Sequence, residues 1–182
     1  MKSLKMRTIY ILTFVSILSS CTSDNFYDTR RIISTDKDQY KIGDNFEITL
    51  TIVPTDNEKK IRIYDNYKNL EISFALVNPS KGILNDDWSL HSGQSLSDSK
   101  IIDLKISKQK PFTKTFKGKI IDNKTTLTLS IPELKMTATF DKEKVTDGTY
   151  IRVHGFCNPI DPEFGASLEE YFDVKDIRII GE

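Results

Sequence analysis

The chain has 182 residues, and its 26 basic residues are matched by 26 acidic ones, so that it carries no formal net charge at neutral pH. A protein that binds nucleic acid through its phosphates needs a basic surplus, so this balance argues against nucleic acid as a partner. Alanine is scarce and β-branched residues are abundant, which favours strands over helices.

The chain begins with the pattern of an export signal. Lys2, Lys5 and Arg7 form a basic start, and a largely apolar run follows over 9–18. This order is typical of a secretory signal. The apolar run is too short to cross a bilayer as a helix, which takes roughly 20 residues.

The signal ends in Leu18-Ser19-Ser20-Cys21, which resembles the lipobox of bacterial lipoproteins. The resemblance implies that the thiol of Cys21 receives a diacylglycerol, that residues 1–20 are removed, and that the new N-terminus is acylated. Two or more acyl chains make a stable anchor. The resemblance therefore implies a protein anchored by lipid in the outer membrane, facing the periplasm or the cell surface.

The alternative for this segment is an ordinary secretory signal, with Cys21 a plain thiol that is free to pair with Cys157. With Cys21 lipidated, Cys157 is a lone cysteine that we expect to be buried. Residues 21–30 then comprise the lipidated cysteine and a polar tether, and 31–182 form a single domain.

The domain is predicted to consist of strands joined by turns, because apolar and polar residues alternate with a period of two. The expected strands are 46–52, 61–64, 70–76, 101–106, 112–120, 127–131, 136–140, 150–157 and 172–180, with an irregularity at 175–176. Turns are expected at 41–44 and 147–148. In the strand 112–120, Lys114 falls on the same side as Phe112 and Phe116.

Strands that each hide one face pack naturally as two sheets, so the sequence predicts an all-β sandwich. The order Tyr40-x-x-Gly43-Asp44-x-Phe46-x-Ile48 resembles the entry into the second strand of many bacterial immunoglobulin-like domains. The resemblance implies an immunoglobulin-like antiparallel β-sandwich.

No group of residues reaches the standard of a catalytic site. His91 and His154 are the only histidines, and on a strand His154 and Cys157 point to opposite faces. Asp86, Asp87 and His91 could coordinate a metal, but their spacing matches no specific site, and surface loops are often acidic. We therefore expect no enzyme, metal or cofactor, and a hydrolase with an unrecognised site is the weakest hypothesis.

Binding is the better prospect. In an immunoglobulin-like sandwich, the connection that follows the strand 46–52 and the one that follows 150–157 lie at one end, which variable domains use for recognition. Tyrosine and arginine among short polar residues favour a recognition surface. The possible partner-binding residues are Arg62, Tyr64, Asp65, Tyr67, Asn158, Asp161, Glu163 and Phe164. An open alternative is that Pro159 and Pro162 only stiffen the second connection.

The sequence thus predicts a non-enzymatic, membrane-anchored envelope lipoprotein that binds a protein or glycan partner through loops. The alternative is a periplasmic inhibitor or immunity-type protein that blocks a protease or toxin. Because the first strand of such a sandwich starts at the end that bears these loops, we expect the recognition end to face the membrane.

Overall fold

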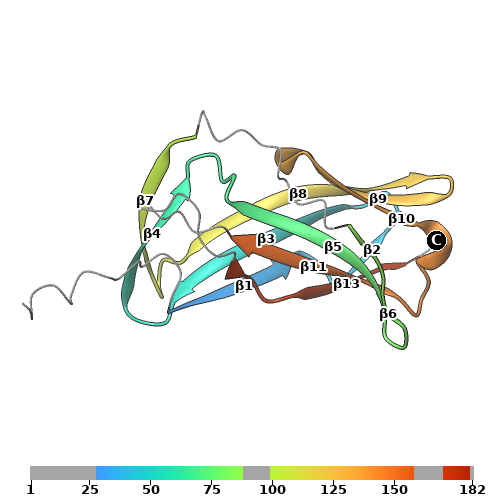
Figure 1. Ribbon diagram of the computed structural model, residues 1–182, viewed down its shortest axis with the longest axis horizontal. Coiled ribbons are helices and arrows are strands. Elements are labelled where there is room, and N and C mark those ends of the chain that lie inside the picture. Colours follow the sequence, from blue (N-terminus) through green and yellow to red (C-terminus); the bar gives the residue numbers. More distant parts are fainter. Residues whose placement is uncertain (1–27, 88–98, 158–169, 181–182) are drawn as a thin grey trace, which may run out of the picture.

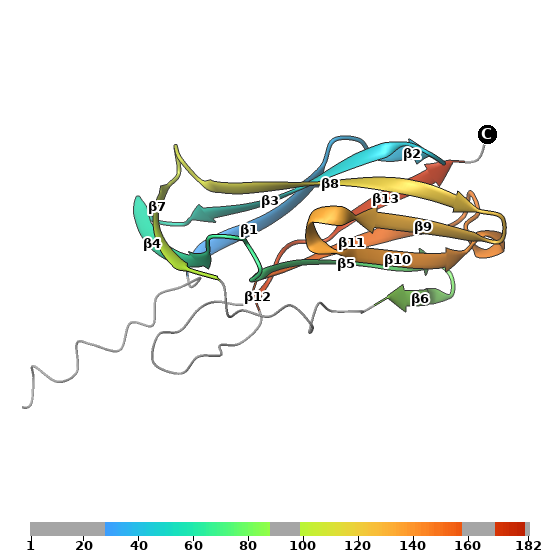
Figure 2. The ribbon, with the colours of Figure 1, turned by 90° about the horizontal axis from the view of Figure 1, so that it is seen from above.

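The computed structural model describes residues 28–87, 99–157 and 170–180, and strands dominate all three ranges. Most strands run along the long axis of the molecule in two sheets, and a short two-stranded ribbon lies at one end (Figures 1 and 2). A cluster of buried apolar side chains from both sheets forms the core. The predicted class, an all-β antiparallel sandwich, is confirmed.

The first sheet has the spatial order β1-β3-β8-β9-β10, and every neighbouring pair is antiparallel. Its strands are β1 (Thr29–Thr35), β3 (Asn45–Pro54), β8 (Phe112–Asn123), β9 (Thr126–Ile131) and β10 (Met136–Asp141). In β3, the apolar side chains at alternate positions from Phe46 to Ile52 are all buried. The two-residue period of the sequence therefore marks the face that meets the second sheet.

The second sheet has the order β2-β13-β11-β5-β6, and the short β12 pairs with the end of β11. Its strands are β2 (Gln39–Lys41), β5 (Leu70–Asn78), β6 (Gly82–Asp87), β11 (Tyr150–Cys157), β12 (Glu170–Tyr171) and β13 (Lys175–Ile180). Neighbours are antiparallel except β2 and β13, which are parallel. The adjacency of β5, β11 and β13 agrees with that of the third, sixth and seventh strands of an immunoglobulin domain.

The connections of the first sheet differ in detail from the immunoglobulin order. In that order the fourth strand lies at the sheet edge and the fifth lies beside the second. Here β8 lies directly beside β3, and the chain then moves outward through β9 to the edge strand β10. It crosses to β11 only from that edge.

A separate ribbon of two antiparallel strands, β4 (Glu58–Tyr64) and β7 (Ile101–Ser107), closes one end of the core. Ile61, Ile63 and Ile106 point inward and are buried in the core cluster. The short strand predicted at 61–64 is thus confirmed, and it belongs to neither of the two main sheets.

The sequence prediction is wrong at the last strand. Residues 172–174 belong to no strand, and β13 runs without interruption through the predicted irregularity at 175–176. The reason is a contact that is distant in sequence. The amide of Phe172 donates to the carbonyl of Gly155 at 2.9 Å. The buried side chain of Phe172 occupies the space into which a Cβ atom at position 155 would project.

Aromatic rings join the two sheets in the core. The ring of Phe46 in β3 makes edge-to-face contacts with Tyr40 at 6.2 Å and with Phe74 of β5 at 6.0 Å between centroids. Gly118 in β8 faces the same ring, and a Cβ atom at this position would lie 2.1 Å from Cζ of Phe46. Only glycine fits there, because a fully buried ring in a close-packed core has little room to move.

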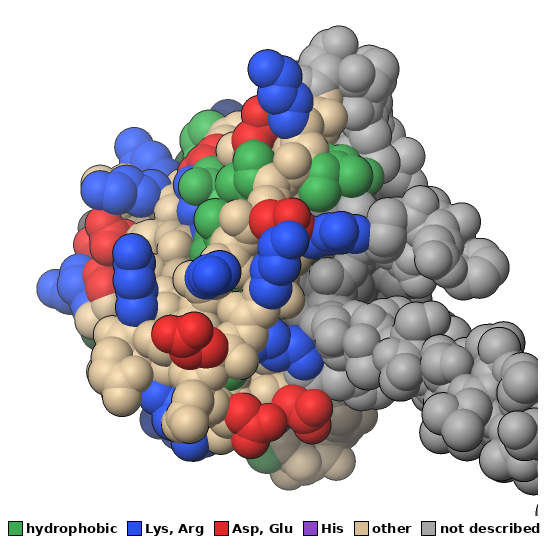
Figure 3. All heavy atoms as spheres, turned by 90° about the vertical axis from the view of Figure 1, so that its left-hand side faces the viewer, with side chains coloured by type: hydrophobic (Ala, Val, Ile, Leu, Met, Phe, Trp, Pro, Cys, Tyr) green, Lys and Arg blue, Asp and Glu red, His purple; other side chains and the backbone are tan. Residues whose placement is uncertain are grey.

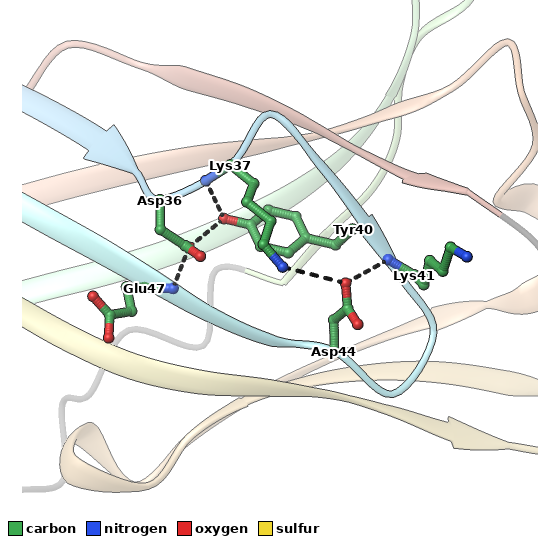
Figure 4. A network of polar contacts seen from close by, with 6 residues as sticks. All are labelled: Asp36, Lys37, Tyr40, Lys41, Asp44 and Glu47. Atoms are coloured by element: carbon green, nitrogen blue, oxygen red, sulfur yellow. Dashed lines mark hydrogen bonds and ion pairs between the residues drawn. The ribbon is translucent and has the colours of Figure 1, made fainter.

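The hydroxyl of Tyr40 organises the crossing from β1 in the first sheet to β2 in the second (Figure 4). It donates to Oδ1 of Asp36 at 2.6 Å and accepts a hydrogen bond from the amide of Lys37 at 3.1 Å. The same Oδ1 accepts the amide of Glu47 in β3 at 2.7 Å. The carboxylate of Asp36 therefore binds both the hydroxyl of the buried Tyr40 in β2 and the backbone of β3.

The predicted turn at 41–44 is confirmed, and it adjoins this network (Figure 4). Gly43 has a φ of +91°, a backbone conformation that favours glycine. Oδ2 of Asp44 accepts the amide of Lys41 at 3.0 Å and lies 3.8 Å from Nζ of Lys37. The turn returns the chain from β2 to β3. Side-chain hydrogen bonds therefore hold the chain both before β2, through Asp36, and after it, through Asp44.

The network should make stability sensitive to acid through Asp36. Burial alone would raise the pKa of Asp36, but the hydrogen bonds from Tyr40 and Glu47 outweigh burial and leave the pKa below its usual value. A carboxyl group with a lowered folded-state pKa stabilises the fold above its unfolded pKa, near 4, and this contribution is lost as the pH falls through the folded value.

Asp36→Asn keeps an acceptor oxygen and removes the charge. We expect the wild type to be the more stable of the two at pH 7, and the difference in unfolding free energy to shrink as the pH falls below about 4. Urea denaturation at a series of pH values measures this. Asp56→Asn, in the exposed turn before β4, is the matched control. A difference that stays constant down to low pH would contradict the role of the charge.

Candidate functional site

The described strand ends that border the two connections lie side by side at one end of the second sheet. Leu70, at the start of β5, lies opposite Cys157, at the end of β11. Nδ2 of Asn69 donates to Sγ of Cys157 at 3.6 Å, and the cysteine is buried as expected. The predicted partner-binding residues of the second connection, Asn158, Asp161, Glu163 and Phe164, lie outside the described residues, as does Cys21.

Arg62 lies on the outer face of the β4–β7 ribbon, because its neighbours Ile61 and Ile63 point into the core. Its Nε donates to Oδ1 of Asp103 in β7 at 2.9 Å, and Nζ of Lys60 lies 2.6 Å from Oδ2 of the same carboxylate. The hydrogen bonds from Lys60 and Arg62 lower the pKa of Asp103. The guanidinium is thus held in a fixed position on the surface.

Tyr64 and Asp65 continue the ribbon at the end of β4. Tyr64 is half-buried and lies opposite Ile101, whose side chain is 52% exposed. The amide of Asp65 donates to the carbonyl of Lys100 at 2.9 Å, and Oδ1 of Asp65 accepts the amide of Lys100 at 3.1 Å. Asp65 is exposed and braces the end of the ribbon.

Tyr67 has a different environment from the other three predicted residues. Its φ of +59° is uncommon for a bulky side chain. Its ring centroid lies 6.2 Å from that of Phe112 and 4.5 Å from Nζ of Lys114 in β8. The structure therefore groups Arg62, Tyr64 and Asp65 on the ribbon, whereas Tyr67 packs against the start of β8.

Lys114 is the residue whose importance the sequence did not reveal. Its Nζ lies 2.5 Å from Oε1 of Glu133, and 4.5 and 5.2 Å from the ring centroids of Tyr67 and Phe116. Its side chain is only 18% exposed. The sequence does place Lys114 at a core-facing position of an alternating strand. Two of its partners, Tyr67 and Glu133, come from connections distant in sequence and leave no local sign.

The surface at this end combines charge with apolar groups. Figure 3 faces this end and shows hydrophobic side chains with basic and acidic side chains around them. The ribbon contributes the exposed Ile101 and the partly buried Ile102 and Leu104, together with basic residues of β4. Apolar and charged side chains are therefore exposed next to one another at this end.

The chain enters the domain at this same end. The carbonyl of Asp28, the first described residue, accepts hydrogen bonds from the amide and the hydroxyl of Thr55, both at 2.7 Å. Thr29 in β1 lies opposite Pro54, the last residue of β3. The described N-terminal entry therefore lies at the same end as the connection between β3 and β5.

Among the described residues, the side chains with catalytic or metal-binding chemistry do not come together. His154 stacks on Phe156 on the outer face of β11, while Cys157 lies in the core, so the two are on opposite faces as expected. Burial lowers the pKa of His154, with a further contribution from Arg152. Asp86 and Asp87 end β6, and His91 lies outside the described residues. Within the described ranges, no three His, Cys, Asp or Glu residues form a group that could hold a metal.

The described residues also contain no helix with the length and apolar character needed to cross a membrane.

Lys114 should stabilise this end of the fold. We expect Lys114→Ala to lower the free energy of unfolding by about 1–2 kcal/mol, because the variant lacks the ammonium group and its partly desolvated contacts with two rings and a carboxylate. Lys117→Ala is the matched control in the same strand. Lys117 is 82% exposed and pairs only at the surface with Glu47, so its removal should cost about 0.5 kcal/mol or less. Chemical denaturation measures both, and equal losses would contradict the assignment.

No protein-family model matches the sequence, and no match was found among curated proteins. Among solved structures, the crystal structure of Spo0M, a sporulation control protein from Bacillus subtilis, is similar at 10% sequence identity and a TM-score of 0.33. The similarity covers 84% of this chain and 49% of that chain, so this chain spans about half the length of Spo0M. A similarity this remote says nothing about function or partners.

Proposed function

We propose that this protein is a non-enzymatic envelope lipoprotein, anchored in the outer membrane through lipid on Cys21, and that its sandwich is a module that binds a protein or glycan partner. The observation that carries the proposal is the N-terminal segment, in which a basic start, an apolar run and Leu18-Ser19-Ser20-Cys21 occur in the order of a lipoprotein signal. The lipid fixes the protein at the membrane and leaves the domain outside the bilayer.

The position of the N-terminal entry supports binding close to the membrane. Fully extended, the chain from Cys21 to Asp28 reaches about 25 Å. Asp28 is hydrogen-bonded to Thr55 beside the β4–β7 ribbon. The ribbon therefore operates within a short distance of the lipid, and its partner is a molecule found at the membrane surface.

The outer face of the ribbon supports a role in recognition. Arg62 is held by Asp103, so less conformational freedom is lost when a partner binds it. Tyr64 and the exposed Ile101 supply apolar area beside this charge. Arginine and tyrosine are among the residue types that most often dominate binding energy at interfaces. Tyr67, from the first connection, and Asn158, Asp161, Glu163 and Phe164, from the second, complete the proposed surface.

The anchor is tested with the two cysteines as a matched pair. We expect the wild type and Cys157→Ala to partition into the membrane fraction, and Cys21→Ala to be released, because only Cys21 carries lipid in this proposal. Mass spectrometry of the mature protein should show a chain that starts at an acylated Cys21. A mature protein without acyl chains and with a Cys21–Cys157 disulfide would overturn the lipoprotein assignment.

The partner is tested by a photoreactive amino acid at position 64, with one at the exposed Thr137 of β10 as the control. We expect a discrete crosslink from position 64 in intact cells, weakened by Arg62→Ala and absent from position 137. A crosslinked protease or toxin whose activity the protein blocks would favour the inhibitor alternative. Equal labelling from both positions would contradict recognition by the ribbon.

A further inference from the structure

A second surface lies at the opposite end of the molecule from the ribbon. It is a depression of about 400 Å³ lined by Asp38, Gln39, Pro79, Tyr150, Asp176 and Arg178. Tyr150 pairs with Val77 at the far end of the ladder that joins β11 to β5, whereas Cys157 and Leu70 mark the ribbon end. At a rise of roughly 3.4 Å per residue, this ladder separates the two surfaces by about 25 Å.

Three strands of the second sheet bring these side chains to its outer face. In β13, Ile177 and Ile179 point into the core, so Asp176 and Arg178 point away from it. Arg178 lies opposite Gln39 of β2 in the ladder. Tyr150 is likewise out of phase with the buried Ile151. Pro79 joins them from the turn between β5 and β6.

The polar groups of the depression are held in place before any ligand arrives. Arg152 binds both carboxylate oxygens of Asp176, at 2.8 and 3.0 Å, and also donates to the hydroxyl of Tyr150 at 3.1 Å. The hydrogen bond to Asp176 raises the pKa of Arg152. Nζ of Lys175 lies 2.5 Å from Oδ1 of Asp38. Fixed side chains of this kind are what a binding site requires.

The backbone of the β2 wall is fixed as well. The amide of Arg178 donates to the carbonyl of Asp38 at 2.9 Å, which ties β13 to the start of β2. Asp38 and Gln39 lie between Asp36 and Tyr40, whose side chains are joined in the network of Figure 4. The residues that project into the depression therefore stand on a segment that is anchored at both ends.

The chemistry of the lining selects among classes of ligand. The carboxylates of Asp176 and Asp38 are paired with Arg152 and Lys175, but their oxygens still line the depression beside Arg178. A small anion would therefore meet carboxylate oxygens, and a small cation would meet the guanidinium of Arg178. An apolar molecule would leave these polar groups without water or hydrogen bonds. A neutral polyhydroxyl compound fits all of them, because each hydroxyl both donates to a carboxylate and accepts from arginine or amide groups.

The apolar part of the lining also favours a neutral polyhydroxyl compound. Sugars carry C–H groups on their ring faces, and the rings of Tyr150 and Pro79 line the depression beside the polar groups. The guanidinium of Arg152 lies over the Tyr150 ring, 5.4 Å from its centroid, and holds this ring in place. The volume lies within the range of roughly 300–1,000 Å³ found for small-molecule sites. We propose that this depression binds a neutral carbohydrate, as a free sugar or as the end of a longer glycan. This site is separate from the ribbon and does not depend on the function proposed above.

The test uses the full chain in a detergent without sugar groups. A microarray of neutral glycans, including glucose, galactose and N-acetylglucosamine polymers, identifies a ligand, and isothermal titration measures its Kd. We expect Arg178→Ala and Gln39→Ala each to weaken binding about tenfold, since a lost hydrogen bond to a charged or amide group is worth about 1–2 kcal/mol. Arg30→Ala, an exposed arginine in β1, should bind like the wild type.

Both variants change exposed side chains, and thermal melting confirms that they are folded. Saturable binding that both variants weaken and Arg30→Ala leaves unchanged supports the site. The proposal is overturned if no neutral glycan binds saturably, if inorganic phosphate binds in place of sugars, or if the two variants bind as well as the wild type. None of these results bears on the lipid anchor or on crosslinking from the ribbon, so the two proposals fail independently.

Discussion

The fold depends on how the chain crosses between its sheets within a few residues of its first strand. Tyr40 makes this crossing possible, because its ring packs on Phe46 in the core while its hydroxyl is satisfied by Asp36 and the amide of Lys37. Burial and the bond to Asp36 raise the pKa of this hydroxyl, so it stays a donor. Without that pairing, the phenol would bury an unsatisfied polar group where the two sheets meet.

Much of the fold could be predicted because one face of most strands meets the core. Where apolar and polar residues alternate strictly, as in β3, β9 and β10, the pattern alone located the strand. It failed at 172–174, which alternate like a strand but bond elsewhere. The amide of Phe172 bonds to Gly155 and that of Asp173 to Arg31, and such distant partners leave no periodic trace in the sequence.

The same limit applies to the sites. Residue type and position in a connection led us to expect Arg62, Tyr64 and Asp65 as partner-binding residues, and the structure places these three together at the ribbon. They were not enough to show that Tyr67 packs against Lys114, because that contact joins the β4–β5 connection to β8. The depression at the other end is assembled from β2, β11, β13 and the β5–β6 turn, so no single stretch of sequence contains it. Local chemistry can be read from a sequence, but convergence of distant strands cannot.

The parallel pairing of β2 with β13 has a consequence for how the domain forms. β13 is the last of the described strands, yet it lies between β2 and β11 and is hydrogen-bonded on both sides. The second sheet therefore cannot close until residues near 180 have left the ribosome and reached residues near 40. Contacts so far apart in sequence make folding slow. The last described strand is therefore among the first requirements of the finished sheet, and a chain that lacks it leaves β2 and β11 without their shared neighbour.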